Sequence, residues 1–543
     1  MHKINPVLQD KYLQNGVVCT TITENQKMVI LVKEFKEGTM RNIGTKRQFF
    51  FNHALLDTEK STARIQLGDK PVRREKIMTF HEVWENNRVS YPSFFYDEEE
   101  KKYKMYYCAS MRKDLNSIDA HEMDVPDMRF CYAESQDGLN WVKPNLGLYP
   151  VNGDYNNNVI IDHDAGNTFD NFFVYKDINP NCPPDELYKG IAYDTRGPET
   201  PRRSGMDSNR VLLLFKSADG IHFNPEGELL DLEGRFDTHN TVYWDPEDQL
   251  YHMYFRDLTV GYCAPEIETK VWVRLVYHAT SKDFRTWENA EPLRYQEGSP
   301  ETQMYTNGVI PYYRGDGMWI GFPSRYFEYS TWMPNHDYLP ANKERKDLFG
   351  VMSRCATAVT DCGFMYSENK TDWYRFDEAY FTPGPENQDN WFYGCCYPAV
   401  GMMENTNDFG EKELAMIMPI TKWNRKDEGF LLKYVELYRY TMRVDGFACV
   451  HADGKGAEAL TQPFTFEGSK LEMNFRSSAG GYIDVSLTDE EGNALDGYSD
   501  VRIFGDSLER PVDFAGDLTK LNGKPVRLKL KMADADAFSF RFC

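Results

Sequence analysis

One phrase recurs four times along this chain: a serine, an acidic or amide residue two positions later, and an aromatic residue six positions later. The copies begin at Ser135, Ser217, Ser281 and Ser367, between 64 and 86 residues apart. The first two contain Asp-Gly, which favours a tight hairpin because both residues tolerate a positive φ. Self-similarity at a long period is typical of repeat folds. The phrase therefore predicts that each repeat is one β-sheet and that each copy is the hairpin that ends it.

The sequence between about residue 89 and residue 445 alternates as short strands with almost no helical periodicity. Five units each begin with an apolar, aromatic strand and continue with a second strand after a turn. The paired segments are 91–96 with 103–107, 172–175 with 188–192, 240–244 with 251–255, 305–310 with 318–322, and 397–401 with 414–418. Five such units predict a five-bladed β-propeller, about four strands to a blade, over residues 71–445.

The two ends of the chain differ from this pattern. After Phe447 the strands alternate cleanly and are separated by turns such as Glu491-Gly492 and Asn522-Gly523. This texture predicts a small antiparallel β-sandwich over residues 446–543. Residues 1–70 are less regular, and we expect them to pack on the propeller or to supply a closing strand. The whole chain is thus predicted to be all-β.

Composition excludes several classes of function. The net charge of −22 argues against a nucleic-acid partner, because a polyanion would be repelled. The eleven cysteines are scattered without a Cys-x-x-Cys pair, so neither a disulfide framework nor a zinc site is expected, and no other cofactor is indicated. No signal peptide or apolar run of about 18 residues is present, which predicts no membrane partner. A cytoplasmic location is favoured, although a chain that had lost its signal peptide would look the same. Homo-oligomer formation is left open.

Acidic residues precede the first strands of four units. In a propeller these strands start at the central funnel, so the side chains just before them converge on one pocket. The residues in question are Glu85, Asp170, Asp237 and Glu301. Glycoside cleavage needs such convergence, because one carboxyl group donates a proton while another activates water or attacks the anomeric carbon. The alternative is that these acids only cap turns, since the chain contains 84 acidic residues.

A second set of residues beside the same strands is suited to binding a sugar. It comprises Arg88, Arg235, Asn240, Arg256, Tyr305, Asn307, Arg325 and Trp391. The arginines could orient carboxylates or bind an anionic group through paired donors, or they could form ion pairs that hold the blades together. The asparagines could bind sugar hydroxyls or satisfy backbone groups at strand ends.

Several phrases together resemble a known family. They are Trp84-Glu85, Phe236-Asp237 with Asn240, Tyr305-Thr306-Asn307, Phe322-Pro323 with Arg325, Thr360-Asp361, 383–386 and Val444-Asp445-Gly446-Phe447. Over roughly residues 50 to 543 the chain resembles the five-bladed propeller glycoside hydrolases. It is most similar to a bacterial set related to the N-terminal domain of glycoside hydrolase family 32.

The resemblance implies that the working acids come from the first three blades, at Glu85, Asp170 and Asp237. The match to that family is incomplete. The Asn-Asp-Pro-Asn-Gly, Arg-Asp-Pro and Glu-Cys phrases of invertase-type enzymes are absent. Glu85 stands where these enzymes have Asp, and Asp237 stands where they have Glu.

The sequence thus predicts an exo-acting glycoside hydrolase with an oligosaccharide substrate. Asp237 or Glu301 would be the acid, and Glu85 or Asp170 the base or nucleophile. One alternative is a glycoside phosphorylase, which needs a single acid and a cationic phosphate pocket. The other is a carbohydrate-binding propeller without catalytic activity.

Overall fold

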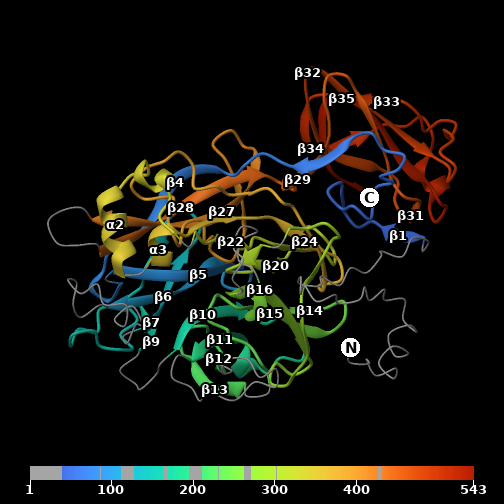
Figure 1. The fold of residues 1–543 in the computed structure, drawn as a ribbon. Helices are drawn as coiled ribbons and strands as arrows, with labels where there is room; N and C mark the ends of the chain where they lie inside the picture. Colours follow the sequence, from blue (N-terminus) through green and yellow to red (C-terminus); the bar gives the residue numbers. More distant parts are fainter. Residues whose placement is uncertain are drawn as a thin grey trace, which may run out of the picture.

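The structure is a computed structural model that describes residues 40–85, 87–111, 128–162, 169–194, 211–229, 232–261, 271–300, 302–329, 331–351, 353–424 and 431–543. Strands dominate these residues, and the α-helices among them are α2 (Asn342–Val351) and α3 (Ser353–Thr357). The predicted all-β class is confirmed (Figure 1). No helix in the described ranges is long and apolar enough to cross a membrane.

Three antiparallel sheets follow one another in chain order. The first contains β5 (Asn87–Asp97), β6 (Lys102–Met111), β7 (Met128–Ser135) and β8 (Trp141–Val142), with β9 (Val159–Ile161) beside β7. The second contains β10 (Phe169–Lys176), β11 (Tyr188–Asp194), β12 (Val211–Ser217) and β13 (Asn224–Leu229). The third contains β14 (Thr241–Asp245), β15 (Leu250–Gly261), β16 (Val271–Ser281) and β17 (Trp287–Pro292).

The fourth and fifth repeats are less regular. The fourth consists of β20 (Val309–Pro311), β21 (Trp319–Gly321), β24 (Met365–Ser367), β25 (Asp372–Arg375) and β18 (Arg294–Tyr295), next to a separate sheet of β19 (Gln303–Met304), β22 (Ser324–Phe327) and β23 (Val359–Cys362). The fifth consists of β26 (Met403–Thr406), β27 (Lys412–Asn424), β28 (Leu431–Arg443) and β4 (Val72–Phe80). The strand that completes the fifth repeat thus comes from residues 72–80, which lie in the predicted 71–445 unit and not in residues 1–70.

The first strands of successive sheets lie side by side. β5 contacts β10, β10 contacts β14, and β14 contacts β20. Ser93 of β5 forms a parallel bridge with Val400, which precedes β26. The fourth and fifth repeats meet where the Oγ of Ser324 donates to the carbonyl of Cys396 at 3.1 Å. Figure 1 shows β10 to β13 running outward from this common middle to the margin of the molecule.

The four repeated phrases share one turn geometry, as predicted. In the first, the backbone N–H of Gly138 donates to the Oγ of Ser135 at 2.9 Å, and the N–H groups of Leu139 and Asn140 donate to Asp137. The turn residue has φ of 75° at Gly138, 76° at Gly220, 69° at Phe284 and 72° at Lys370. These turns join β7 to β8, β12 to β13, β16 to β17 and β24 to β25.

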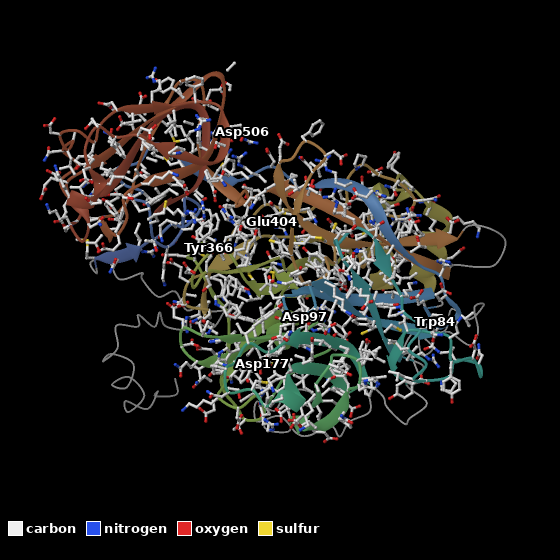
Figure 2. The ribbon with its side chains drawn as sticks, turned by 180° about the vertical axis from the view of Figure 1, so that it is seen from behind. Trp84, Asp97, Asp177, Tyr366, Glu404 and Asp506 are labelled. Atoms are coloured by element: carbon white, nitrogen blue, oxygen red, sulfur yellow. The ribbon has the colours of Figure 1, made fainter. Side chains whose placement is uncertain are left out.

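Neighbouring sheets are also joined by a repeated polar contact at the far ends of their first strands. Asp97, at the end of β5, is fully buried and accepts a hydrogen bond from Tyr188 of the second sheet. Asp177, just after β10, accepts one from Tyr251 of the third sheet at 2.7 Å. Figure 2 places both aspartates among the densely packed side chains of the five sheet repeats, which are called the ring sheets below. Each contact ties one repeat to the next.

The C-terminal part has a core of its own. Its sheet is built on the long strands β32 (Leu471–Thr488) and β35 (Arg527–Phe542), with β29 (Ala448–Ala452), β30 (Ala457–Leu460), β33 (Val501–Ile503) and β34 (Asp506–Val512) beside them. Three N-terminal strands pair here: β1 (Arg41–Gly44) with β31 (Phe464–Phe466), β2 (Gln48–Phe49) with β35, and β3 (Arg64–Leu67) with β29. Phe49 and Phe51 also pack into the core of the ring sheets. The N-terminal segment thus bridges the two parts.

Candidate functional site

The backbone is left-handed where the first strands enter the middle of the ring. Non-glycine residues with positive φ include Tyr91 (52°), Asn171 (61°), Phe236 (43°), Trp391 (61°) and Cys396 (54°). The pairing register shifts at Tyr91 and at Asn171, so both lie in β-bulges. Bulges redirect side chains, and strained backbone gathers at functional sites. Tyr91 and Asn171 lie within first strands, whereas Phe236, Trp391 and Cys396 lie in the segments that precede β14 and β26.

Tyrosines form the centre of this region. The hydroxyl groups of Tyr305 and Tyr393 are 2.5 Å apart, and the ring of Tyr305 stacks on that of Tyr397 at 5.2 Å. The ring centre of Tyr326, in β22, lies 5.9 Å from the ring centres of both Tyr305 and Tyr393. The pKa values of Tyr393 and Tyr397 are raised well above the ordinary value of a tyrosine. Burial is the largest cause, and the neighbouring tyrosines add to it. These phenols are therefore neutral at physiological pH.

Three arginines surround the tyrosines. The guanidinium carbon of Arg256 lies 4.9 Å from the ring centre of Tyr305, and that of Arg274 lies 5.3 Å from the same ring. Arg354 of α3 lies 5.6 Å from the ring of Tyr393. Aromatic faces attract cations, so these contacts are stabilising. Burial alone would lower the pKa of Arg256, but the neighbouring Asp237 carboxylate, together with Tyr305, raises it above its ordinary value.

The structure brings two of the four predicted acids to this centre. Asp237 forms an ion pair with Arg256 at 2.8 Å, and its side chain is 55% exposed. Asp170 lies in β10, where its carboxylate accepts the N–H of Asn171 at 2.7 Å. Both carboxylates help to raise the pKa of Tyr91, after burial and the neighbouring tyrosines, so both lie near that residue. The prediction that these two acids share one catalytic pocket stays a prediction.

The two other predicted acids are not seen at the centre. Glu85 lies in the short 3₁₀-helix η3 (Val83–Glu85), where it is buried. Its carboxylate accepts hydrogen bonds from Tyr107 and Lys143, both at 2.7 Å. Tyr107 belongs to β6 and Lys143 follows β8, so Glu85 connects these two segments of the first repeat. Glu301 lies outside the described residues.

Four of the eight predicted binding residues have structural contacts. Asn240 and Asn307 bond to backbone groups, which is the alternative that the sequence left open. Arg325 forms a two-point ion pair with Asp361, with both distances at 2.7 Å. The indole of Trp391 donates to the carbonyl of Gly384 at 2.8 Å.

The four other predicted binding residues lie in or beside the centre or have side chains that the structure does not describe. Arg256 and Tyr305 lie in the centre, as described above. The backbone of Arg235 donates to the carbonyl of Arg256 at 3.2 Å, so this residue lies beside the centre. The side chain of Arg88 lies outside the described residues.

Sequence reasoning missed several residues of the centre. Tyr91, Arg274, Gln303, Tyr393 and Tyr397 were not proposed as site residues. Tyr91 and Tyr397 each directly precede a proline, a signal that could have been noticed. Arg274 gives no such signal, because its position depends on how β16 pairs with β15.

Several buried polar atoms at the centre have no hydrogen-bond partner. Among the described residues they include Nε and Nη1 of Arg256, Nε of Arg274, Nε2 of Gln303, the hydroxyl of Tyr397 and Nε2 of His239. Both side-chain amide atoms of Asn171 belong to the same group. Buried polar groups in proteins are nearly always paired. Several such atoms beside one group of tyrosines indicate a site that a polar ligand completes.

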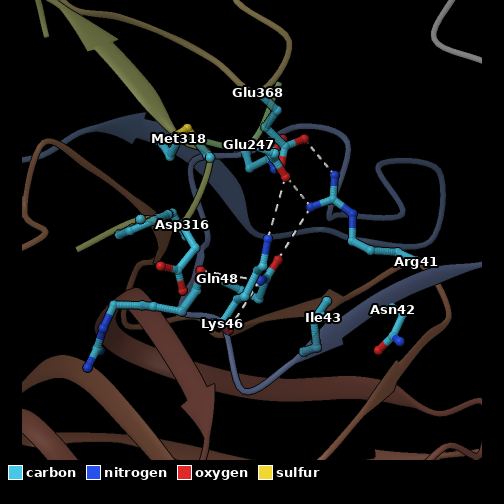
Figure 3. Close-up of a pocket in the computed structure, with 14 residues that line it drawn as sticks. Arg41, Asn42, Ile43, Lys46, Gln48, Glu247, Asp316, Met318 and Glu368 are labelled. Carbon is cyan, nitrogen blue, oxygen red and sulfur yellow. Dashed lines mark hydrogen bonds and ion pairs between the residues drawn. The ribbon is translucent and has the colours of Figure 1, made fainter. Parts of the chain in front are cut away.

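Two cavities lie apart from this centre. One of about 290 Å³ is lined by charged residues of the N-terminal segment and of neighbouring turns (Figure 3). Two ion pairs form within its lining, Arg41 with Glu368 at 2.6 Å and Lys46 with Glu247 at 3.7 Å. The other, of about 370 Å³, lies at the far ends of β5 and β10 and includes Ser93 and Tyr243. Neither cavity contains the tyrosines and arginines of the centre.

One group of side chains has the composition of a metal site. Donor atoms of Asp245, Asp248 and His252 lie within 4.8 Å of one another. The ammonium group of Lys370 forms ion pairs with both aspartates, and its distance to Asp248 is 3.0 Å. Nδ1 of His252 lies 2.8 Å from Nε2 of His278. Lys370 thus supplies the positive charge that a cation would bring.

Comparison with known proteins gives structural neighbours only. No family model and no curated protein matches the sequence. Similar solved structures include a family 117 glycoside hydrolase from Zobellia galactanivorans, with a TM-score of 0.36 and 12% identity over 70% of this chain and 90% of that one. A family 32 β-fructofuranosidase from Bombyx mori gives a TM-score of 0.33 and 9% identity over 87% and 94%.

A mannose phosphorylase from Leishmania mexicana, in complex with phosphate ion, gives a TM-score of 0.35 and 11% identity over 68% and 88%. The two glycoside hydrolases belong to the broad group that the sequence motifs resemble. At these TM-scores the likeness carries no argument about the activity of this chain, which has to come from the site itself.

Proposed function

We propose that this protein is a glycoside hydrolase that cleaves a terminal sugar from an oligosaccharide at the centre of a five-bladed β-propeller. The five sheet repeats would be the blades, and residues 446–543 would form an attached β-sandwich. One observation carries the proposal: the carboxylates of Asp170 and Asp237 both act on Tyr91, beside a group of tyrosines and unpartnered hydrogen-bond donors. Paired carboxylates with aromatic surface are what glycoside cleavage requires.

The contacts of the two acids suggest different parts for them. Asp237 is the anionic member of an ion pair with Arg256, which suits a base or nucleophile better than an acid. The sequence had favoured Asp237 as an acid, and we revise that assignment. The proton donor is then Asp170 or Glu301. Tyr305 and Tyr397 would provide the surface on which the sugar ring packs.

A glycoside phosphorylase is the second candidate, and a specific observation favours it. Arg256, Arg274 and Arg354 all lie within 6 Å of a ring of the same tyrosine group. A phosphorolytic enzyme needs a cationic pocket for phosphate in place of one carboxylate. Release of a sugar 1-phosphate only when phosphate is added would identify this activity.

The experiment that tests the proposal is an activity screen on aryl furanosides and pyranosides, with and without phosphate. On the responding substrate, D237N and D170N should lower kcat by about 10²- to 10⁴-fold, because each removes a group that acts in the transition state. E85Q is the matched control, since Glu85 is a buried carboxylate bonded elsewhere. Full turnover by both aspartate variants would refute the proposal.

A further inference from the structure

Four unpartnered atoms of the central site can only donate hydrogen bonds. They are Nε and Nη1 of Arg256, Nε of Arg274 and Nε2 of Gln303. The hydroxyl of Tyr397 can donate as well. Arg256 itself is only 5% exposed, so these donors are not available to bulk water. A ligand that satisfies them must present acceptor oxygens.

The charge of the site is also incompletely balanced. Arg256 has Asp237 as its counterion. Arg274 is half-buried and, within the described part of the chain, forms no ion pair: its Nη1 donates at 3.0 Å to the neutral amide of Gln303. Glu328, which follows β22, accepts a hydrogen bond from Tyr326 at 2.7 Å. A half-buried guanidinium without a counterion is stabilised by an anion that binds to it.

The two arginines can act on one ligand. In the β15–β16 pairing, Arg256 lies opposite Val276 and Arg274 lies opposite Leu258, so the arginines are diagonal neighbours on one face of the sheet. Each guanidinium carbon is about 5 Å from the ring centre of Tyr305. The same aromatic ring therefore positions both cations.

We infer that Arg256 and Arg274, with Gln303 and Tyr397, form a subsite for an oxyanion, and that the anion is carried by the substrate sugar as a carboxylate. The substrate class would then be uronic-acid-containing oligosaccharides. This inference rests on the proposed function, which it narrows to acidic sugars. Free phosphate has the same chemistry as a ligand, and the experiment separates the two sources.

The test measures binding to the full chain by calorimetry, independently of turnover. The ligands are glucuronate, galacturonate, neutral glucose and galactose, and inorganic phosphate. We expect a uronate to bind at least 10-fold more tightly than its neutral counterpart. R274Q should remove this preference, whereas R274K should retain part of it because the charge remains. The control is R502Q, which removes an exposed arginine of the C-terminal sheet.

Each outcome decides something. Equal binding of uronate and neutral sugar by the native protein, or an unchanged preference in R274Q, overturns the subsite. Binding of phosphate alone, lost in R274Q, overturns the uronate assignment and supports phosphorolysis. A uronate preference without any cleavage refutes the proposed hydrolase and leaves the subsite standing. If the protein cleaves neutral glycosides and R274Q does not change this cleavage, the proposed hydrolase stands and the subsite is refuted.

Discussion

Glu85 and Asp237 occupy comparable places in the sequence, just before a first strand, yet their surroundings differ. The carboxylate of Glu85 has no exposed surface and is bonded to Lys143 and Tyr107, whereas that of Asp237 is 55% exposed beside Arg256. Removing one member of a buried ion pair leaves the other charge unpaired. We expect E85Q to lower the free energy of unfolding by about 3 kcal/mol, measured by urea denaturation, with kcat within about twofold of the native value. Loss of activity in a folded E85Q protein would instead return Glu85 to the list of catalytic residues.

His239 makes a separate prediction about pH. It is buried, and burial lowers its pKa from 6.5 to about 3. The unfolded chain therefore binds a proton at this residue between about pH 6.5 and pH 3 that the folded chain does not, so stability falls as the pH drops through this window. H239Q should make the free energy of unfolding less dependent on pH between 6.5 and 4, measured by denaturation at a series of pH values. An unchanged slope would show that His239 is protonated in the folded protein.

The residues of the site were predictable where chemistry and strand position coincide. Asp170, Asp237, Arg256 and Tyr305 stand in or beside first strands, and the structure brings them together. Arg274 was not predictable, because it reaches Tyr305 only through the β15–β16 register. The ionic partner of Glu85 was also not predictable, because Lys143 directly follows β8 and is 58 residues away in the sequence.

At the scale of elements, the hairpin phrase depends on one left-handed residue. A Cβ atom on Gly220 would lie 2.6 Å from the hydroxyl of Tyr106 and 3.0 Å from the ring of Tyr188, with φ at 76°. G220A should therefore lower the free energy of unfolding by about 3 kcal/mol, the sum of backbone strain and steric clash. G410A is the matched control, since Gly410 has φ of 80° and open space around it, and we expect a loss of about 1 kcal/mol. Equal losses in thermal or urea denaturation would show that the clash contributes nothing.

Among the elements, hairpins were predictable from the repeated phrase, whereas pairings between distant strands were not. The phrases beginning at Ser135, Ser217, Ser281 and Ser367 marked four hairpins correctly, because a turn is determined by a few adjacent residues. The fourth hairpin does not end its sheet, since β18 pairs beyond β25. The pairing of β4 with β28 was not located, since it joins residues about 360 positions apart and leaves no local signal. The separate β19–β22–β23 sheet also escaped prediction, because short strands within long loops carry little periodicity.

At the scale of the whole molecule, one buried side chain joins three parts of the chain. Asp445 is fully buried and accepts hydrogen bonds from Tyr312 at 2.6 Å, Arg314 at 2.9 Å and Ser539 at 2.8 Å. Arg47 of the N-terminal segment lies 3.6 Å away. The fourth sheet repeat, the C-terminal sheet and the N-terminal segment thus meet at a single carboxylate. Burial would raise the pKa of Asp445, but Arg314 and Arg47 hold it below its ordinary value.

This arrangement predicts that Asp445 couples the unfolding of the two parts. D445N removes the buried counterion of two arginines and leaves them only the half-exposed Glu509 as a shared partner. We therefore expect a loss of about 3 to 5 kcal/mol and two separate transitions in calorimetry. Because the pKa of Asp445 is lowered on folding, its contribution is complete above about pH 4 and is lost as the pH falls further; the native protein should lose its coupling there. D506N is the control, since Asp506 pairs with Arg443 at the same junction with 63% exposure and should change stability by less than about 1 kcal/mol. A single transition in D445N, at the native temperature, would show that the two parts are coupled by their apolar contacts instead.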